Sequence, residues 1–435
     1  MMKIYLKSIS VIAIGTSLFM ACESKTITDP VKEIVYPEMA EAANPTILTE
    51  ANGVKVYQGG FGSALVQDSK DLAVFYMLTD RGPNIDGTVA NSKVFAQPNF
   101  TPQIGVFRLV KDQLVLEKTI ELQNENGVKL TGLPNPIGQG STGETAFDLM
   151  GKTLAPSVDG IDSEGLALAP DGTFWVSDEY GPHIVHFDAN GKTIERINPF
   201  GTGKGGRKLP LVFTRRRANR GMEGLTITPD GKTLVGIMQF PLYNPSAAAI
   251  SGSLAIRILT YDIATGTSKQ YVYLMEKSTL QAVSEITAIT NTTFLVLERD
   301  GEFATMTNKA TVIKKIYKID LAGATDISDA TDGAGGKLFG GKTVEELKTA
   351  DALQTIGIVT VSKTAVSDLV NDIATTYPHD KAEGIVVINS TMIAVSNDDD
   401  FGVFGLGNYA TKILPATNSV DRNRIYFIKL KQPLK

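Results

Sequence analysis

The chain has 435 residues, and its 47 acidic residues outnumber its 42 basic ones. This balance excludes a generic nucleic-acid-binding surface, which needs an excess of positive charge, although it allows a local basic pocket for a small anion. A single cysteine, Cys22, excludes an internal disulfide, and abundant glycine (41 residues) with few aromatic residues (7%) is typical of many short strands joined by turns.

The N-terminal segment has the pattern of an export signal. Two lysines precede a mainly apolar stretch at 11–20, which is too short to span a bilayer but suits the hydrophobic part of a signal peptide. Residues 19–22, Phe-Met-Ala-Cys, resemble the bacterial lipobox, with Cys22 as the lipidation site. We therefore expect a signal peptide over 1–21 and an exported lipoprotein of the cell envelope, on its periplasmic or surface face. An ordinary cleaved signal followed by a stray cysteine is the alternative.

The segment 22–45 is polar, contains three prolines and lacks a clear period, so it is interpreted as a tether. The globular body is expected to span 46–435, where no stretch is long and apolar enough for a transmembrane helix. This body is longer than most single domains, but repeat architectures and propellers reach its size as one unit.

A repeated hairpin pattern runs through the body. In its clearest copies a strand that begins with Glu-Gly-Leu is followed by a Pro-Asp-Gly turn and an apolar return strand. Asp-Gly between apolar runs is a strong hairpin signal. Copies of varying clarity lie at 162–178, 221–237, 283–300, 381–398 and 60–81, the last with Ser63 in place of the glutamate.

Further strands are expected after the hairpins, at 184–187, 254–261, 271–274 and 312–319. A four-stranded unit used five times predicts an all-β fold, a β-propeller with five recognisable blades. The unequal spacing predicts inserted loops at 122–160 and 321–352, which leave room for a sixth, degenerate blade. The last strand, 424–430, is expected to complete a blade with 54–57 and so close the ring.

Together these motifs resemble the phytase-like propeller family, labelled "esterase-like activity of phytase", over most of the body. The resemblance is carried by the Asp-x-Glu-Gly-Leu strand with its Pro-Asp-Gly turn at 162–172, its copy at 223–231, the strands of 284–299, and Glu383-Gly384 with 396–399. It implies a propeller fold and a hydrolase of the phytase or esterase type.

The repeated glutamates are candidate metal ligands. The innermost strand of each blade lines the central channel of a propeller, so glutamates at its start are expected to converge at one channel mouth: Glu164, Glu223, Glu285 and Glu383. Like charges this close require protons or a cation, and Ca²⁺ suits an all-oxygen ring. In the alternative interpretation, each glutamate accepts backbone N–H bonds from the next blade and locks the blades together.

Cations and a histidine lie beside these repeats. Arg81, Arg220 and Arg299 are candidate substrate-binding residues because a guanidinium group matches phosphate bidentately; inter-blade ion pairs are the alternative.

His183 follows Asp178 and Glu179 on a blade loop, and these three are the candidate catalytic residues, with His183 as a general acid or phosphate contact. An incidental loop histidine is the alternative.

The sequence thus predicts an extracytoplasmic, metal-dependent phosphoesterase that acts on a small anionic substrate, expected to be a phosphate ester, and is attached to the membrane through Cys22. No nucleic-acid partner is expected. Two alternatives stay open: a non-catalytic propeller that binds a ligand or partner at the cell envelope, and a carboxylesterase. The carboxylesterase lacks a Gly-x-Ser-x-Gly elbow, but a serine within hydrogen-bond reach of His183 or His379 would favour it.

Overall fold

The computed structural model describes Met1 and residues 34–277, 281–373 and 377–434. The chain divides into two compact units, Met1–Val35 and Tyr36–Lys435, and the second is described below. The predictions for the signal peptide and for Cys22 fall on residues outside the described ranges. Within those ranges, none of the helices combines the length and the apolar character needed to cross a membrane.

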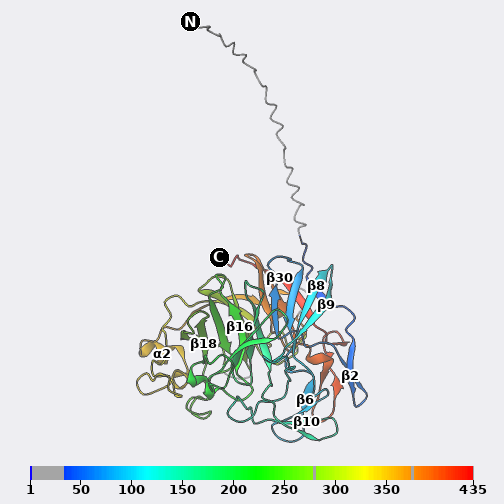
Figure 1. Ribbon diagram of the computed structural model, residues 1–435, viewed down its shortest axis with the longest axis horizontal. Helices are drawn as coiled ribbons and strands as arrows, with labels where there is room; N and C mark the ends of the chain where they lie inside the picture. The colour runs from blue at the N-terminus through cyan, green and yellow to red at the C-terminus, as the bar shows by residue number, and fades with distance from the viewer. Residues whose placement is uncertain (2–33, 278–280, 374–376, 435) are drawn as a thin grey trace. The chain divides into compact units, whose positions relative to one another are not determined.

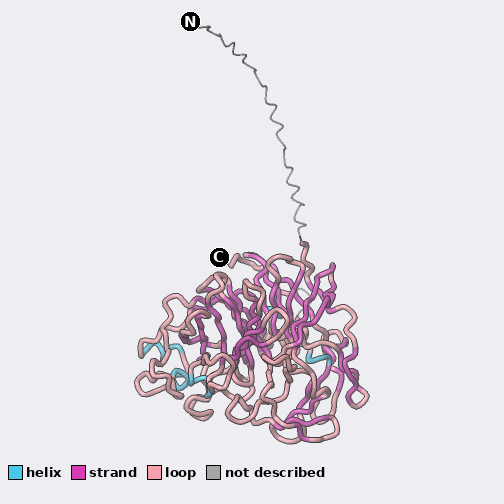
Figure 2. Tube along the Cα trace, in the orientation of Figure 1, coloured by secondary structure: helices cyan, strands magenta, loops and turns pink. Residues whose placement is uncertain are grey.

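Strands dominate the second unit (Figure 2). They form five four-stranded antiparallel blades. In each blade the two innermost strands form a hairpin, as the Asp-Gly turns predict for blades 2 and 3. In order from the innermost strand outward, the blades are: blade 1, β4 (Ala64–Gln67), β5 (Val74–Leu78), β8 (Gln103–Val110) and β9 (Gln113–Glu121); blade 2, β12 (Ser163–Leu168), β13 (Phe174–Asp178), β14 (His183–Phe187) and β15 (Thr193–Ile197); blade 3, β16 (Met222–Ile227), β17 (Thr233–Met238), β18 (Ala255–Asp262) and β19 (Ser268–Leu274); blade 4, β20 (Ala282–Ala288), β21 (Thr293–Arg299), β22 (Lys314–Asp320) and β23 (Ser362–Asp368); blade 5, β24 (Ile385–Asn389), β25 (Met392–Ser396), β30 (Arg424–Lys429) and β1 (Met39–Ala42).

The five innermost strands contact one another in a closed ring, in the order β4, β12, β16, β20, β24 and back to β4. This ring confirms the predicted all-β propeller and its five blades. In the described residues, neither predicted insertion forms a sixth blade. The insertion at 122–160 adds β10 (Thr145–Asp148) and β11 (Thr153–Leu154) to a small sheet with β6 (Asn84–Asp86) and β7 (Ser92–Phe95), and the one at 321–352 holds α1 (Val344–Leu347) and the start of α2 (Ala350–Thr355) (Figure 1).

The remaining short elements lie in loops between the blade strands. They are the hairpin β2 (Ile47–Ala51) and β3 (Val54–Tyr57), the 3₁₀ helices η1 (Leu211–Arg215) and η2 (Asp400–Gly402), the helix α3 (Leu369–Asp372), and the paired strands β26 (Val403–Phe404) with β27 (Ala410–Thr411) and β28 (Ile413–Leu414) with β29 (Ser419–Val420).

The strand that closes the ring differs from the prediction. β30 pairs antiparallel with β1, whereas the predicted partner at 54–57 pairs with β2 in a separate hairpin. β1 also pairs in parallel with β9, so it joins blade 5 to blade 1, and β30, β9 and β8 lie side by side in Figure 1. The compact unit therefore begins at Tyr36, upstream of the start expected at Thr46, because β1 completes the last blade.

The glycine that follows the repeated glutamate has a packing role. A Cβ on Gly165 would lie 2.4 Å from the backbone nitrogen of Leu225, and one on Gly224 would lie 2.5 Å from that of Ile286. Glycine at these positions therefore lets the inner strands of neighbouring blades approach closely. Ser177 adds a polar link between blades 2 and 3, since its hydroxyl accepts the Gly165 N–H and donates to the Glu223 carbonyl, each at 2.8 Å.

Apolar side chains fill the space between the blades. One buried cluster extends across blades 2, 3 and 4 and includes Trp175, Leu225, Ile237, Ile286 and Phe294. The return strands β13, β17 and β21 are buried along nearly their whole length, because both of their faces pack against neighbouring blades. This rigid packing positions the loops at the two ends of the channel.

Candidate functional site

A cavity of about 720 Å³ opens where the inner strands begin and the return strands end. All five blades contribute to its lining. The lining includes Asp80 from blade 1, Glu164 and Glu179 from blade 2, Glu223 and Gln239 from blade 3, Arg299 from blade 4 and Glu383 from blade 5. The cavity is therefore one mouth of the propeller channel.

Three of the four predicted metal ligands line this cavity, and the fourth does not. Glu164, Glu223 and Glu383 are buried side chains of the lining. Glu285 lies outside the lining, and its Oε1 accepts the backbone N–H of Leu225 at 3.2 Å and that of Ile286 at 2.8 Å. The bond to Leu225 crosses from blade 4 to blade 3, so at this one position the blade-locking alternative describes the geometry.

A tight group of carboxylates lies on the blade 2 side of the cavity. Oxygen atoms of Asp162, Glu164 and Glu179 lie within 4.8 Å of one another, and all three residues are buried. Burial raises the pKa of Asp162 and of Glu164 well above the usual range, and the surrounding carboxylates raise both further. We call these three residues the acid triad.

The donor set of the cavity fits a hard cation. Four buried acceptor oxygens of the lining have no hydrogen-bond partner among the described residues: Asp162 Oδ2, Glu223 Oε2, Glu383 Oε2 and Gln239 Oε1. Arg81 Nε approaches Asp162 Oδ2 only to 3.6 Å. Unpaired buried acceptors are costly, and oxygen atoms without competing donors are what Ca²⁺ or a similar ion prefers. The cavity therefore suits a divalent cation, and one of its four unpaired oxygens, Asp162 Oδ2, belongs to the acid triad.

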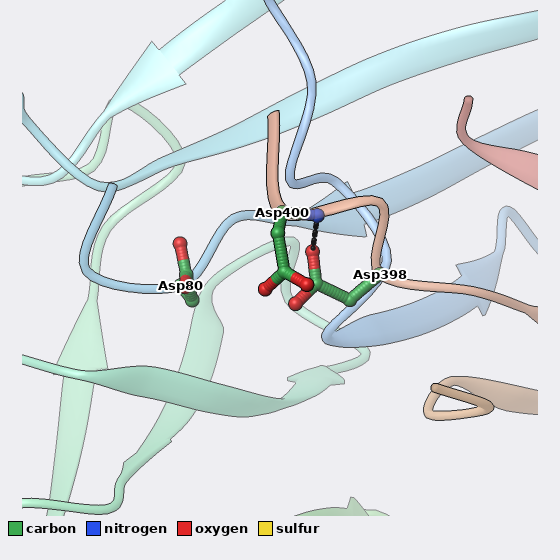
Figure 3. Close-up of side chains that lie close together, drawn as sticks. All are labelled: Asp80, Asp398 and Asp400. Atoms are coloured by element: carbon green, nitrogen blue, oxygen red, sulfur yellow. Dashed lines mark hydrogen bonds between the residues drawn. The ribbon is translucent and has the colours of Figure 1, made fainter. Parts of the chain in front are cut away.

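A second acidic cluster lies on the blade 1 and blade 5 side and consists of Asp80, Asp398 and Asp400, drawn in Figure 3. Here two ammonium groups already supply the positive charge. Lys381 Nζ lies 2.6 Å from oxygens of both Asp398 and Asp400, and Lys412 Nζ lies 2.6 Å from the other oxygen of Asp400. Although burial opposes ionisation, these lysines hold the pKa of Asp400 well below its usual range. The acid triad, rather than this cluster, is therefore the candidate cation site.

The three predicted substrate-binding arginines all line the cavity, and each crosses a blade boundary to a carboxylate. Arg81 and Arg299 are nearly buried, whereas the Arg220 side chain is 36% exposed. Their ion pairs are Arg81 with Asp162 (3.6 Å) and Glu144 (3.2 Å), Arg220 with Glu179 (3.1 Å), and Arg299 with Glu383 (2.6 Å). The inter-blade ion pairs of the alternative interpretation are therefore present, and substrate binding by these arginines stays a prediction.

Of the predicted catalytic residues, only Glu179 lines the cavity. Asp178 and His183 are buried behind it, with Asp178 Oδ2 2.6 Å from His183 Nδ1. Burial, with help from the nearby Arg196, lowers the pKa of His183 to about 4. Asp178 Oδ1 accepts the backbone N–H of Asp162 at 2.9 Å, so this pair positions the acid triad from behind.

The histidines offer no support for a serine hydrolase. His379 bonds to Asp421 at 2.7 Å and to the Tyr426 hydroxyl at 2.8 Å, and His186 bonds to Thr173 at 2.8 Å. In the described part of the chain, no histidine has a serine hydroxyl as hydrogen-bond partner. The condition that would have favoured the carboxylesterase alternative is therefore not met there.

Asp80, Asp162, Gln239 and Lys381 are cavity residues that the sequence reasoning did not select. The sequence holds a signal for two of them, Asp162 and Gln239. Asp162 lies two residues before a repeated glutamate, and the side chains of a strand alternate, so both can point to one side. Gln239 directly follows a return strand, as Glu179 does in the preceding blade.

The family model described as "Phytase-like: Esterase-like activity of phytase" matches residues 57–401. The chain belongs to this phytase-like family. The match extends from the first hairpin to the turn after β25, so it covers nearly all inner and return strands of the phytase-like propeller and most of its cavity lining.

Individual relatives of this phytase-like protein are distant. An uncharacterized secreted protein of Arthroderma benhamiae is 28% identical over 303 residues, which cover 56% of the chain and 59% of the relative. Among solved structures, the PQQ-bound aldose sugar dehydrogenase of Streptomyces coelicolor has 11% identity and a TM-score of 0.33 over 88% of this chain and 87% of that chain. Virginiamycin B lyase of Staphylococcus aureus has 11% identity and a TM-score of 0.31 over 86% and 95%. The blade assignment rests on the strand pairing of the chain itself.

Proposed function

We propose that this protein is an exported, metal-dependent phosphomonoesterase whose site is the cavity at the channel mouth. The observation that carries the proposal is the acid triad, Asp162, Glu164 and Glu179, with its oxygens within 4.8 Å beside the guanidinium groups of Arg81 and Arg220. Carboxylates that gather a cation next to arginines that bind phosphate form a workable phosphoester site. Membership of the phytase-like family, which is a hydrolase-type family, supports the same reading.

The proposed roles follow from the contacts. The acid triad would hold a divalent cation, which when bound supplies positive charge to the phosphoryl oxygens as the reaction proceeds. The partly exposed Arg220 binds a phosphate oxygen, and its ion pair with Glu179 keeps it directed at the cation site. Arg81 stays paired with Glu144 and Asp162, and so orients the triad from the blade 1 side. Asp178 accepts a hydrogen bond from the backbone N–H of Asp162 and so holds that residue in position.

Export and membrane attachment are part of the proposal. The signal-like N-terminus with Cys22 supports a lipid anchor, and the relative named as a secreted protein supports export. Incorporation of radiolabelled palmitate in a bacterial host tests the anchor. Label in the wild-type chain that disappears in Cys22→Ala supports lipidation, and equal label in both contradicts it.

Phosphate release by the protein started after Cys22 tests the activity. The substrates are an aryl phosphate and phytate, each with added Ca²⁺ and with chelator. We expect release that requires the metal and falls at least about tenfold in Glu164→Gln and Glu179→Gln. Glu285→Gln is the matched control, because Glu285 is equally buried but lies outside the cavity lining. A folded protein that releases no phosphate would favour the non-catalytic, ligand-binding propeller.

A further inference from the structure

Parts of the cavity lining differ in chemistry. All five blades contribute charged groups, whereas the loop 240–253, which connects β17 to β18, contains no charged residue. The cavity-lining residues of this loop form an apolar wall that includes Phe240, Pro241, Tyr243, Ala247 and Ile250. The same cavity therefore offers charged groups to a phosphate and apolar surface to the rest of the molecule to which it is esterified.

An exposed aromatic side chain lines another part of the cavity. Phe404, on the short strand β26, lines the cavity and is 54% exposed. Phe240 lies under two guanidinium groups, with the Arg217 and Arg220 carbons 5.3 and 5.5 Å from its ring centroid. Phe240 thus lies directly beside Arg220, the proposed phosphate-binding group.

The charge of the cavity disfavours a polyanion. Nine lining carboxylates face six lining cations: Asp80, Asp86, Asp162, Glu164, Glu179, Glu223, Asp300, Glu383 and Asp400 against Arg81, Lys93, Arg217, Arg220, Arg299 and Lys381. Of these cations, Arg217 is the one for which the described residues provide no carboxylate within ion-pair distance. One phosphate can use Arg217, Arg220 and a bound cation, whereas several phosphates would meet uncompensated carboxylates.

We propose, building on the proposed function, that the substrate is a monophosphate ester of an aromatic alcohol and that Phe240 and Phe404 determine this specificity. Water adds its oxygen to phosphorus, the bond between phosphorus and the ester oxygen breaks, and the departing oxygen takes a proton from the water, so that one alcohol and one inorganic phosphate form. Covering Phe404 with an aryl group removes apolar surface of both partners from water. A polyphosphorylated polyol gains nothing from these aromatic side chains.

The test compares kcat/KM for phenyl phosphate, glycerol 3-phosphate and phytate in the wild-type protein and in Phe240→Ala and Phe404→Ala. We expect each substitution to lower kcat/KM for phenyl phosphate by about tenfold and to change it less than about twofold for glycerol 3-phosphate. The intrinsic reactivity of each ester cancels in the ratio of variant to wild type. Leu406→Ala is the matched control, because Leu406 follows closely in the same segment and is 69% exposed but does not line the cavity. Equal losses on all substrates, or a preference for phytate, would overturn the proposal.

A binding measurement separates this proposal from the failure of the proposed function. Calorimetry with phenylphosphonate and methylphosphonate requires no turnover. Tighter binding of phenylphosphonate that disappears in Phe404→Ala supports the role of Phe404 even if no ester is hydrolysed. Equal affinity for the two phosphonates in the wild-type protein overturns it even if phosphate is released.

Discussion

Arg299 Nη2 lies 2.6 Å from Glu383 Oε1, and this ion pair joins blade 4 to blade 5 at the channel mouth. Both side chains are largely buried, so removal of one leaves the other as an uncompensated charge. We expect Arg299→Met to lower the free energy of unfolding by about 3–5 kcal/mol. Arg108→Met is the control, since the Arg108 pairs are 37% or more exposed and should contribute about 1 kcal/mol or less. Guanidinium denaturation measures both, and equal losses would contradict an inter-blade role for Arg299.

The cation site proposed at the acid triad predicts that stability depends on a cation. A ligand that binds only the folded state stabilises it by about 2.7 kcal/mol at one hundred times its Kd. We expect added Ca²⁺ to raise the Tm of the wild-type protein and of Glu285→Gln, and to leave the Tm of Glu164→Gln unchanged. Thermal unfolding with and without chelator checks this. An equal Ca²⁺-dependent rise in Glu164→Gln would place the ion elsewhere.

Asp399 makes stability depend on pH. Burial, reinforced by the nearby Asp421 carboxylate, raises the pKa of Asp399 to about 7. An aspartate in the unfolded chain has a pKa of about 3.9, so between about pH 4 and pH 7 the folded state holds the extra proton. The stabilisation is therefore complete below about pH 4 and is lost as the pH rises to about 7, with a slope of at most about 1.4 kcal/mol per pH unit.

Asp399→Asn removes this titration but keeps an acceptor oxygen for the Gly60 N–H, which lies 2.6 Å from Asp399 Oδ1. Denaturant unfolding of wild type and variant across pH 4 to 7 measures the difference. We expect the two unfolding free energies to diverge as the pH rises, with the variant keeping more of its stability. Parallel curves would show that Asp399 does not titrate in this range.

Gly224 lies where the inner strands of blades 3 and 4 approach each other closely. A Cβ there would lie 2.5 Å from the Ile286 nitrogen and 2.7 Å from the Glu285 Cα, and neither backbone atom can move without opening the blade interface. We expect Gly224→Ala to lower the free energy of unfolding by about 1–3 kcal/mol or more. Gly301→Ala is the control, because nothing lies within 4 Å of its Cβ position. A Gly224→Ala protein as stable as the Gly301→Ala protein would contradict the packing role.

Much of this fold follows from local patterns. The Asp-Gly turns and alternating strands predicted the hairpins of blades 2 and 3, because turn chemistry and side-chain period are properties of neighbouring residues. The closing strand was not predicted correctly. β1 is only four residues long, and its place in the sheet depends on β30, hundreds of residues away in sequence, and on β9, which belongs to the neighbouring blade.

Part of the site was also predictable, because some of its residues belong to the local repeat. The repeat led to Glu164, Glu223 and Glu383, each followed by glycine. In blade 4 the residue after the glutamate is Ile286, and its N–H bonds to the Glu285 carboxylate, which holds that side chain away from the cavity. Asp162 begins the Asp-x-Glu-Gly-Leu motif, but the equivalent position of the next copy is Gly221, so repetition did not single it out. Only the three-dimensional structure shows that Glu179 lies beside it.

The strand β1 gives the propeller a mechanical property. Its hydrogen bonds to β30 on one side and to β9 on the other run across the strand direction. Tension applied along β1 from the N-terminal side therefore loads both ladders in shear, with all their bonds bearing force together. A pull at the N-terminal end of β1 would be shared between the first and last blades, and the ring would resist opening until both ladders gave way.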